Sequence, residues 1–412
     1  MIYIFLTIVL GVLVNRVFNI KNFLNPYVFF FVYQTVFFFL ALSYKNIYST
    51  IEISNVVMLI ITVSYFLTFF GAVISRLIFG NLGFRYVRIV SLEGSNRNQN
   101  SFFYSSFVIY LMGLVCYGVF YYKIGGFLLF ADDLENVRIS SRMNSGLITL
   151  LYVNFMIYGF LGMFMSGLSK IQFFFLFVIT AFCLISFGSR APLMQLTLGS
   201  FIINIIHKMQ LHQKIKYKSF VIPIGLLFAF LIIFGVFRSG VNADMLDLMI
   251  SRAGWRPFVN IHNFQKIYDF FPYKHNFLYG ETMLIDLKLF LPGSNPNFGT
   301  VLKDIMNWRF DGGSITASFI GLGYINFGFI GIVAYSVVYG FIFNTLYELY
   351  IISKQRSYYS TLILMLLSMY LAGSVSSGIL SVILNSIMFL IGICIIQFVI
   401  YNIIKFLITS RK

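Results

Sequence analysis

Long apolar runs separated by short polar connections dominate the chain. Crossing a bilayer takes roughly 20 apolar residues. Runs close to that length fall at residues 1–18, 26–43, 53–79, 102–122, 147–166, 171–187, 193–206, 219–237, 318–347, 358–374 and 377–408. The pattern predicts an all-α, polytopic integral membrane protein with about 11 (10–12) transmembrane helices, the last of them long enough to break at Gly392.

One connection is much longer than the others. Residues 238–313 separate two predicted spans and hold seven of the thirteen acidic residues. A loop of this length is usually functional. Within it, 242–256 has the spacing of an amphipathic helix and 300–307 predicts a short helix. The chain therefore divides into helices 1–8 (1–237), a large loop (238–313) and C-terminal helices (314–412).

The Lys and Arg residues indicate the orientation of the helices. They concentrate in alternate short connections, which by the positive-inside rule face the cytoplasm. The cationic connections carry Arg16 and Lys21; Arg76, Arg85, Arg88 and Arg97; Lys170; Lys208, Lys214, Lys216 and Lys218; Lys354 and Arg356; and Lys405, Arg411 and Lys412. The N-terminus and the 238–313 loop are accordingly predicted to face outward, and the C-terminus inward.

Composition agrees with a bilayer protein and excludes several other classes. The chain is 59% hydrophobic and 10% charged, which is far from a soluble domain. Its net charge of +16 does not indicate nucleic-acid binding, because no basic run is carried by a soluble fold. The three cysteines and four histidines form no metal or disulfide motif, and the adjacent Asp132 and Asp133 are poorly placed to share an ion. We expect no metal and no cofactor.

Two isolated arginines follow apolar helices at their predicted outer ends. Arg190, in "GSRAP", is the only charged residue between Lys170 and Lys208, and Arg238 lies in "FGVFRSG". A charge at such a position either reaches up to the lipid headgroups or lines a wet cavity. In the second case both could bind one anion, with backbone N–H groups of the following helix contributing.

The long loop carries the remaining candidates. Arg252 and Arg256 are four residues apart, with Trp255 beside them. Guanidinium groups match phosphate, and an indole offers a stacking face for a lipid chain or a sugar ring; the alternative is a solvated face with Asp244 and Asp247. The side chains that could accept a proton are His262, His275 and Glu281. Arg309, before Gly312 and Gly313, and Arg142, in the 123–146 loop, are further outward cations.

Three segments carry a resemblance to a known family. They are "GSRAP" opening a late helix, "HNFLYGE" in the long outward loop, and "SITASFIGLGYINFGFIGI" after it. The chain resembles the Wzy-type O-antigen polymerases, the bacterial inner-membrane polymerases of oligosaccharide repeat units. The resemblance implies a GT-C-like membrane fold and glycosyl transfer at the periplasmic face. The growing glycan would leave undecaprenyl diphosphate for the next lipid-linked repeat unit, without a nucleotide donor and with a separate chain-length regulator as partner.

The resemblance also implies roles for the candidate residues. Arginines rather than a metal would hold the diphosphate, and the available set is Arg190, Arg238, Arg252 and Arg256. The attacking hydroxyl would lose its proton to His275, Glu281 or His262, while Arg309, Arg142 and Trp255 would contact substrate secondarily. One departure from the family pattern is that only one outward loop is large, which weakens a two-loop capture mechanism.

Three other functions compete with polymerisation. A flippase or transporter of lipid-linked oligosaccharides would need charged or polar residues inside its helices and usually repeat symmetry, whereas the spans are almost uncharged, the polar residues concentrate in one outward loop, and no internal repeat is seen. The second competing function is that of a membrane scaffold or sensor, and the third is that of an acyl transferase acting on surface glycans. The residues do not identify the sugar or the linkage.

Overall fold

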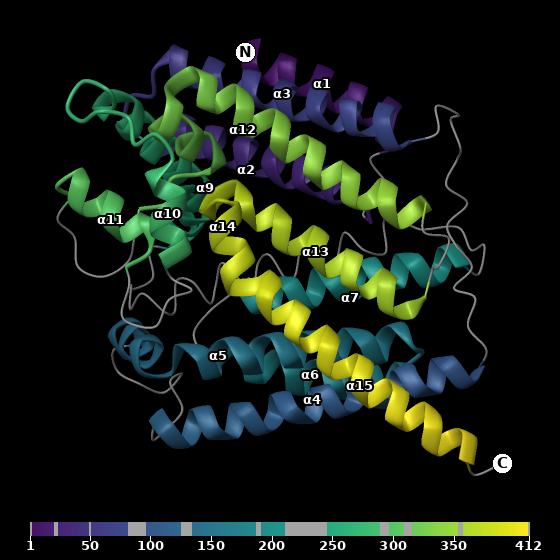
Figure 1. Cartoon of the computed structure of the whole chain (residues 1–412). Helices are drawn as coiled ribbons and strands as arrows, with labels where there is room; N and C mark the ends of the chain where they lie inside the picture. Colours follow the sequence, from purple (N-terminus) through teal and green to yellow (C-terminus); the bar gives the residue numbers. More distant parts are fainter. Residues whose placement is uncertain are drawn as a thin grey trace. The chain divides into compact units, whose positions relative to one another are not determined.

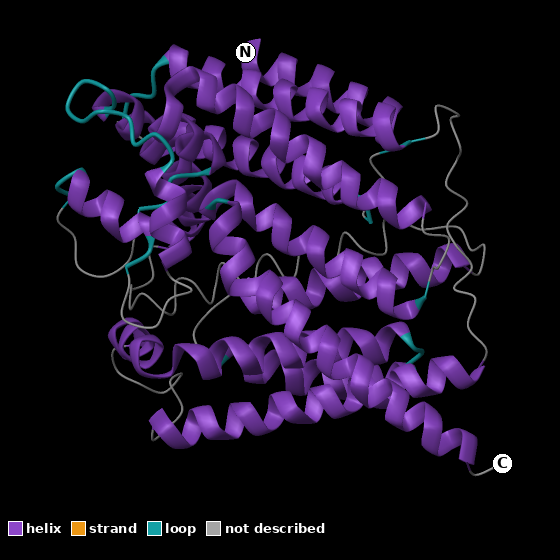
Figure 2. Ribbon diagram, in the orientation of Figure 1, coloured by secondary structure: helices purple, strands orange, loops and turns teal. Residues whose placement is uncertain are grey.

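The computed structural model describes residues 2–19, 24–48, 51–80, 96–124, 134–186, 191–210, 245–288, 296–308, 315–352 and 357–410. Every element in these ranges is a helix, which confirms the all-α prediction (Figures 1 and 2). Seven of these helices are long and apolar enough to cross a membrane: α2, α3, α4, α5, α12, α13 and α15. The helices form two compact units.

Unit 1 holds the beginning of the chain and the long loop. Its helices are α1 (Ile2–Phe18), α2 (Pro26–Tyr48), α3 (Asn55–Phe79), α9 (Met245–Phe270), α10 (Glu281–Leu287), α11 (Phe298–Ile305), α12 (Phe319–Ile352), the second half of α13 (Tyr358–Ser377), and α14 (Ile379–Val382). Unit 2 consists of α4 (Asn96–Ile124), α5 (Leu134–Met165), α6 (Lys170–Ile185), α7 (Ala191–Gln210), the first half of α13, and α15 (Met388–Ser410).

One sequence prediction about the last helix was wrong. The run 377–408 is helical without interruption from Ile379, through α14, a π-helical turn at Ile383–Ile387 and α15, and Gly378, with φ +76°, separates it from α13. A residue in the left-handed backbone conformation commonly ends a helix, and glycine adopts this conformation without strain. Gly392, where we expected a break, lies inside continuous α15. The expected span at 219–237 lies outside the described residues.

Contacts within unit 1 bring three parts of the sequence to one end. The Tyr3 hydroxyl of α1 donates to Asn55 O at the start of α3, 3.0 Å away. Ser54 donates through both N and Oγ to Gln265 Oε1 of α9, each at 2.9 Å. The beginning of α1, the beginning of α3 and the long-loop helix α9 therefore share this end, which we call the α9 end. Its assignment to the periplasm stays a prediction.

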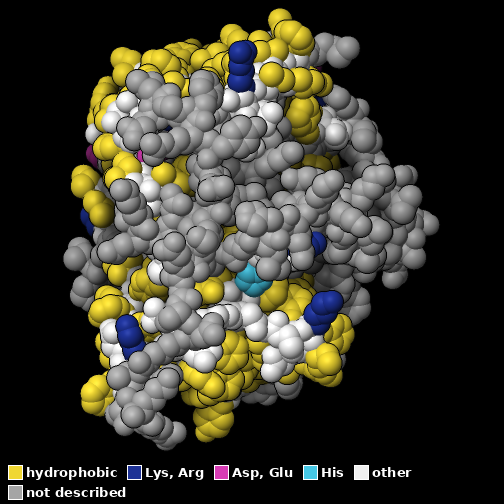
Figure 3. Space-filling model, turned by 90° about the vertical axis from the view of Figure 1, so that its right-hand side faces the viewer, with side chains coloured by type: hydrophobic (Ala, Val, Ile, Leu, Met, Phe, Trp, Pro, Cys, Tyr) yellow, Lys and Arg dark blue, Asp and Glu magenta, His cyan; other side chains and the backbone are white. Residues whose placement is uncertain are grey.

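A buried polar cluster occupies the other end of unit 1. Asn344 of α12 accepts a hydrogen bond from Asn25 at 2.9 Å and donates to Ser75 at 3.2 Å. Arg76, next to Ser75, donates to Val17 O and lies over the Phe18 ring. Figure 3 shows isolated Lys and Arg side chains among hydrophobic ones on one face of the molecule. Arg76 thus lies in the last turn of α3, at the end of unit 1 opposite the α9 end.

Unit 2 is held by hydrogen bonds between helices. Gln397 of α15 is fully buried; it donates to Ser106 Oγ of α4 at 2.9 Å and accepts from the Tyr158 hydroxyl of α5. The same helix presents apolar side chains outward, with Phe398 62% and Phe406 71% exposed. Polar groups inside and apolar groups outside are the arrangement that a bilayer favours.

Helix α12 contains a sharp reversal at its beginning. Phe327 and Gly328 leave helical geometry, with φ +59° at Gly328. A Cβ atom built on Gly323 would lie 2.7 Å from Gly331 O, whereas eight residues of straight helix span about 12 Å. The rings of Phe319 and Tyr339 also pack, 5.1 Å apart. Residues 319–326 therefore fold back on 329–352 as a helical hairpin.

Gly323→Ala should destabilise this hairpin. The added methyl group meets a carbonyl oxygen that cannot move independently of its helix, and such overpacking typically costs about 1–3 kcal/mol. Gly11→Ala in α1 is the control, because nothing lies within 4 Å of a Cβ built there. Purified protein is heated to a series of temperatures, and the folded fraction that remains is measured by size-exclusion chromatography. The midpoint temperature of unfolding should be lower for Gly323→Ala only. Equal midpoints would contradict the close crossing.

Candidate functional site

Helix α9 forms the base of the site and is longer than the sequence predicted. We expected a helix over 242–256, ending before Pro257, but α9 continues to Phe270. A proline inside a helix removes one hydrogen bond and costs about 3 kcal/mol. Burial offsets this cost, because Phe258, Phe264 and Ile267 are at most 1% exposed, and burying each such side chain contributes roughly 1.5–3 kcal/mol.

The hairpin tip of α12 and the chain before α10 are joined by backbone hydrogen bonds. The half-helix 319–326 ends at the reversal, which leaves carbonyl groups without helical partners. The N–H groups of Leu278 and Tyr279 donate to two of these carbonyls, Ile325 O at 2.9 Å and Asn326 O at 3.1 Å. The segment 278–282, in the middle of "HNFLYGETML", thus serves as the cap of a broken helix.

Asn326 fixes the same segment with its side chain. It is fully buried; its Oδ1 accepts from Gly280 N at 2.9 Å, and its Nδ2 donates to Thr282 Oγ1 at 2.7 Å. The turn needs this support because Tyr279 and Gly280 both have positive φ, +45° and +98°. Sequence reasoning did not single out Asn326, since a lone Asn in an apolar helix gives no spacing signal.

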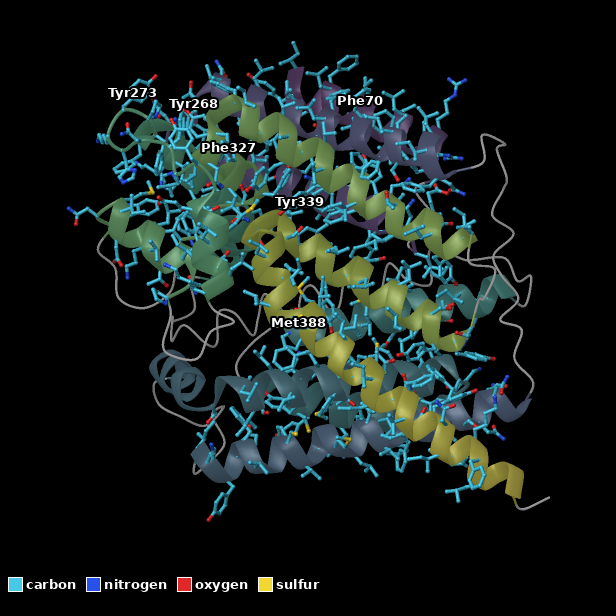
Figure 4. All side chains as sticks on the ribbon, in the orientation of Figure 1. Phe70, Tyr268, Tyr273, Phe327, Tyr339 and Met388 are labelled. Carbon is cyan, nitrogen blue, oxygen red and sulfur yellow. The ribbon has the colours of Figure 1, made fainter. Side chains whose placement is uncertain are left out.

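Glu281 and His275 lie on either side of this clamped turn. Glu281 is the first residue of α10, is exposed, and donates its N–H to Leu278 O at 2.9 Å. His275 is also exposed, and its ring packs edge-on against Phe271 with centroids 5.5 Å apart. Figure 4 shows the neighbouring Tyr268, Tyr273 and Phe327 together at this end of the unit. Two of the three predicted proton acceptors, Glu281 and His275, are therefore on the surface of one hydrogen-bonded corner.

Five rings pack against one another along α9 as a continuous row, which we call the aromatic track. On α9 itself, Phe258 lies 6.1 Å from Trp255 and 6.2 Å from His262 between ring centroids. Tyr44 of α2 packs 4.9 Å from Phe258, and Trp308 lies 6.4 Å from His262. Trp255 is 41% exposed, and His262 and Trp308 are half-buried. Both tryptophans of the chain are in this track.

His262 is uncharged at neutral pH. Burial lowers the pKa of its imidazole below the usual 6.5, and the nearby Lys266 lowers it further. Its Nδ1 is covered and has no hydrogen-bond partner in the described part of the chain. A buried unpaired donor costs more than an unpaired acceptor site, so the tautomer with its proton on Nε2 is favoured. This histidine suits hydrogen-bond donation to a ligand better than proton abstraction.

A second carboxyl group stiffens the corner without reaching its surface. Asp286 of α10 is 8% exposed and accepts the N–H of Phe298, the first residue of α11, at 3.0 Å. Burial raises the pKa of this carboxyl group, and the hydrogen bond partly offsets the rise. Its role is to join α10 to α11, and sequence reasoning did not select it either.

Hydrogen bonds tie the chain that enters the hairpin to α9 and α11. Thr316 donates to Asn260 Oδ1 at 2.9 Å and accepts from Asn263 at 3.2 Å. Ile315 N donates to Gly299 O at 3.1 Å. The α9 end is therefore a connected corner of α9, α10, α11 and the hairpin tip.

An apolar cavity opens on another face of α9 within unit 1. Aromatic and aliphatic side chains supply most of its walls, and Asn260 and Ser318 add polar atoms. The lining includes Phe37 and Phe38 of α2, Tyr65 of α3, Phe264 of α9, Phe319 of α12 and Val375 of α13. The cavity and the aromatic track thus use different sides of the same helix.

The structure describes the side chains of none of the six predicted arginines. Arg190, Arg238 and Arg309 lie outside the described residues. Arg252 and Arg256 belong to helix α9, and Arg142 belongs to α5, but their side chains are not among those described. Of the predicted site residues, the structure places Trp255, His262, His275 and Glu281, all in unit 1. The grouping of the arginines stays a prediction.

These features define a class of protein: a polytopic helical membrane protein with a structured corner of polar and aromatic groups on its long loop. A comparison with protein families identifies the family to which the chain belongs. A family model described as "Putative O-antigen polymerase" matches residues 22–390 of the 412. The chain belongs to the O-antigen polymerase family. No curated protein and no solved structure matches it.

Family membership confirms the resemblance carried by the three sequence segments. An O-antigen polymerase joins oligosaccharide repeat units, so the chain is a glycosyltransferase-like membrane enzyme that acts on lipid-linked glycans. Two of the three segments, "HNFLYGE" and "SITASFIGLGYINFGFIGI", are the two halves of the clamped corner. The residues that sequence alone picked out as a motif are thus in direct contact.

Asn326→Ala should loosen the segment 278–282. It leaves Gly280 N and Thr282 Oγ1 without their partner, at about 1–3 kcal/mol for each unpaired buried group. Lys274 nearby is already exposed, and local opening would free the backbone around it to enter the trypsin active site, so we expect cleavage there to be about fivefold faster or more in the purified protein. Asn402→Ala is the control, because Asn402 is exposed and donates only within its own helix. Unchanged cleavage at Lys274 would show that the clamp is not needed.

The titration of His262 should be displaced to acid. In histidine-labelled protein, the NMR signal lost in His262→Gln should titrate below pH 6.5, and Lys266→Met should move it partway back, because burial remains. The unfolded chain takes up this proton more readily than the folded one. Stability should therefore fall as pH drops from about 6.5 to the lowered pKa and level off below it. An ordinary titration would contradict the burial of the ring.

Proposed function

We propose that the protein polymerises undecaprenyl-diphosphate-linked repeat units at the periplasmic face of the inner membrane. The growing glycan leaves its diphosphate carrier and is joined to a sugar hydroxyl of the next lipid-linked unit. The observation that carries this proposal is the clamped corner, which holds an exposed carboxyl group, Glu281, on the long loop of a family member.

Bond cleavage leaves negative charge on the departing diphosphate. Fixed cations in a poorly hydrated site stabilise such charge without reorganising. Arg190, Arg238, Arg252 and Arg256 are the proposed ligands, with Arg309 and Arg142 as further contacts. In the described ranges, no three His, Cys, Asp or Glu side chains gather as metal ligands. We propose that the arginines carry this task without a metal.

The attacking hydroxyl needs a proton acceptor as its bond forms. Glu281 and His275 are exposed beside the clamped turn, where a bound sugar could reach either group. We assign the base to Glu281 first, because the hydrogen bonds around Asn326 fix its backbone, and to His275 second. His262 was a third candidate; its favoured tautomer supports a binding role instead.

The lipid tail and the setting of the enzyme complete the proposal. The apolar outer surfaces of the helices support binding of a polyprenyl chain. A separate chain-length regulator is the proposed protein partner. The long loop is proposed to face the periplasm and the C-terminus the cytoplasm, on the basis of the Lys and Arg residues in alternate connections of the sequence.

Deletion of the gene tests the proposal. Without a polymerase, surface glycan should collapse to a single capped repeat unit on gels. Reintroducing Glu281→Gln should restore about 1% of polymerisation or less, since a general base contributes roughly 10²–10⁴-fold. Glu52→Gln, which alters another exposed carboxyl group at the same end, is the matched control. Arg190→Ala and Arg190→Lys should also fail while the proteins still accumulate in the membrane.

Two results would overturn the assignment. Long chains at their normal length in the deletion strain would show that another protein polymerises them. Complete absence of repeat units outside the cell would instead indicate a flippase, the main competing function. Full activity of Arg190→Ala would mean that this arginine only reaches for lipid headgroups.

A further inference from the structure

We propose that the aromatic track binds the glycan itself, through stacking of sugar rings on Trp255 and Trp308. The proposal rests on the proposed function and assigns the chemistry of one part of its site. Pyranose rings present flat C–H faces, and indole rings are the side chains best shaped to cover them. The track has an exposed indole near one end, another indole at the other end, and rings in contact between them.

The length of the track suits several sugar rings rather than one. Trp255 and His262 are seven residues apart on α9, about 10 Å along the helix, and Trp308 extends the surface beyond His262. Phe258 is 1% exposed, so it fixes the neighbouring rings from behind and does not itself meet a ligand. A surface of this length would hold more than one residue of a repeat unit.

Polar groups lie where sugar hydroxyls would need them. Stacking fixes the plane of a sugar, and hydrogen bonds to its hydroxyl groups then fix its position. The favoured tautomer of His262 presents a donor on Nε2, and exposed Lys266 lies one turn further along α9. Asp269, also exposed, accepts from Gln265 at 2.8 Å on the same helix. The track thus combines aromatic faces with hydrogen-bond donors and acceptors at its edge.

An aromatic belt at the membrane interface is the competing explanation for exposed tryptophan. Belt residues act singly, each anchoring its own helix in the headgroup layer. Here rings from α2, α9 and the chain after α11 form one surface with a histidine inside it. Helix α9 is also not among the helices apolar enough to span a membrane. These observations favour a ligand over lipid.

The chain carries its own probe for this test. Trp255 and Trp308 are its only tryptophans, so tryptophan emission, excited at wavelengths that its 27 tyrosines do not absorb and measured with a tryptophan-free nanodisc scaffold, reports on the track alone. The full-length protein in nanodiscs is titrated with oligosaccharides of one to four repeat units, prepared from the surface glycan of the producing cells. We expect a saturable change in emission, with an affinity that rises with oligosaccharide length. Trp255→Phe and Trp308→Phe then assign the signal to each indole.

Variants connect binding to chain growth. Trp255→Ala should weaken oligosaccharide binding about tenfold, followed through Trp308. In cells, Trp255→Ala with Trp308→Ala should shorten the glycan chains without reducing them to one repeat unit. Phe70→Ala is the control: Phe70 is 56% exposed on α3 and far along the unit from the α9 end (Figure 4). Its chain lengths should match those of the wild type.

The outcomes separate this inference from the proposed function. If brominated phospholipids quench Trp255 and oligosaccharide causes no response, the tryptophans belong to an interfacial belt. This result would contradict glycan binding by the track. Normal chain lengths in the double variant would do the same, even if gene deletion still leaves single repeat units and the polymerase assignment stands. Oligosaccharide binding by the track, combined with long chains in the deletion strain, would support the glycan-binding role of the track and contradict the polymerase assignment.

Discussion

The reversal in α12 is the constraint on which the functional corner depends. Ending a half-helix inside an apolar protein leaves carbonyl groups that cannot turn to water, and each must find a donor. The donors are N–H groups of Leu278 and Tyr279, and Asn326 adds two further bonds to Gly280 and Thr282. The loop is ordered at this point because the hairpin needs a cap. The position of Glu281 is a consequence of that cap.

Burial decides which groups of the corner are structural and which can meet a substrate. Asp286 is covered and binds a helix end, whereas Glu281 in the same short helix is exposed. The two exposed proton acceptors and the half-buried histidine lie on connected elements but in different environments. Chemistry and recognition can therefore be altered separately: the first by Glu281 and His275, the second by the rings along α9.

Apolar runs predicted most helices because span length depends mainly on local composition, as the bounds of α2, α3 and α13 show. They could not reveal the reversal at Gly328, since "YINFGFIG" is apolar on both sides of it and only the glycine contact shows it. Histidine, Glu and Trp candidates were found by their chemistry. Asn326 and Asp286 were missed because their importance comes from partners distant in sequence. Trp308 could have been found, as one of only two tryptophans.

The hydrogen bonds of Gln397 bear on how such a protein can change over evolution. Its partners Ser106 and Tyr158 are specific, and replacing any of the three breaks a buried network. The neighbouring Phe398 and Phe406 face outward, where any apolar side chain of sufficient size serves equally well. Substitutions can therefore accumulate over most of the surface while a few interior polar contacts keep the helices in register. Two such proteins could share architecture and mechanism with very few identical residues.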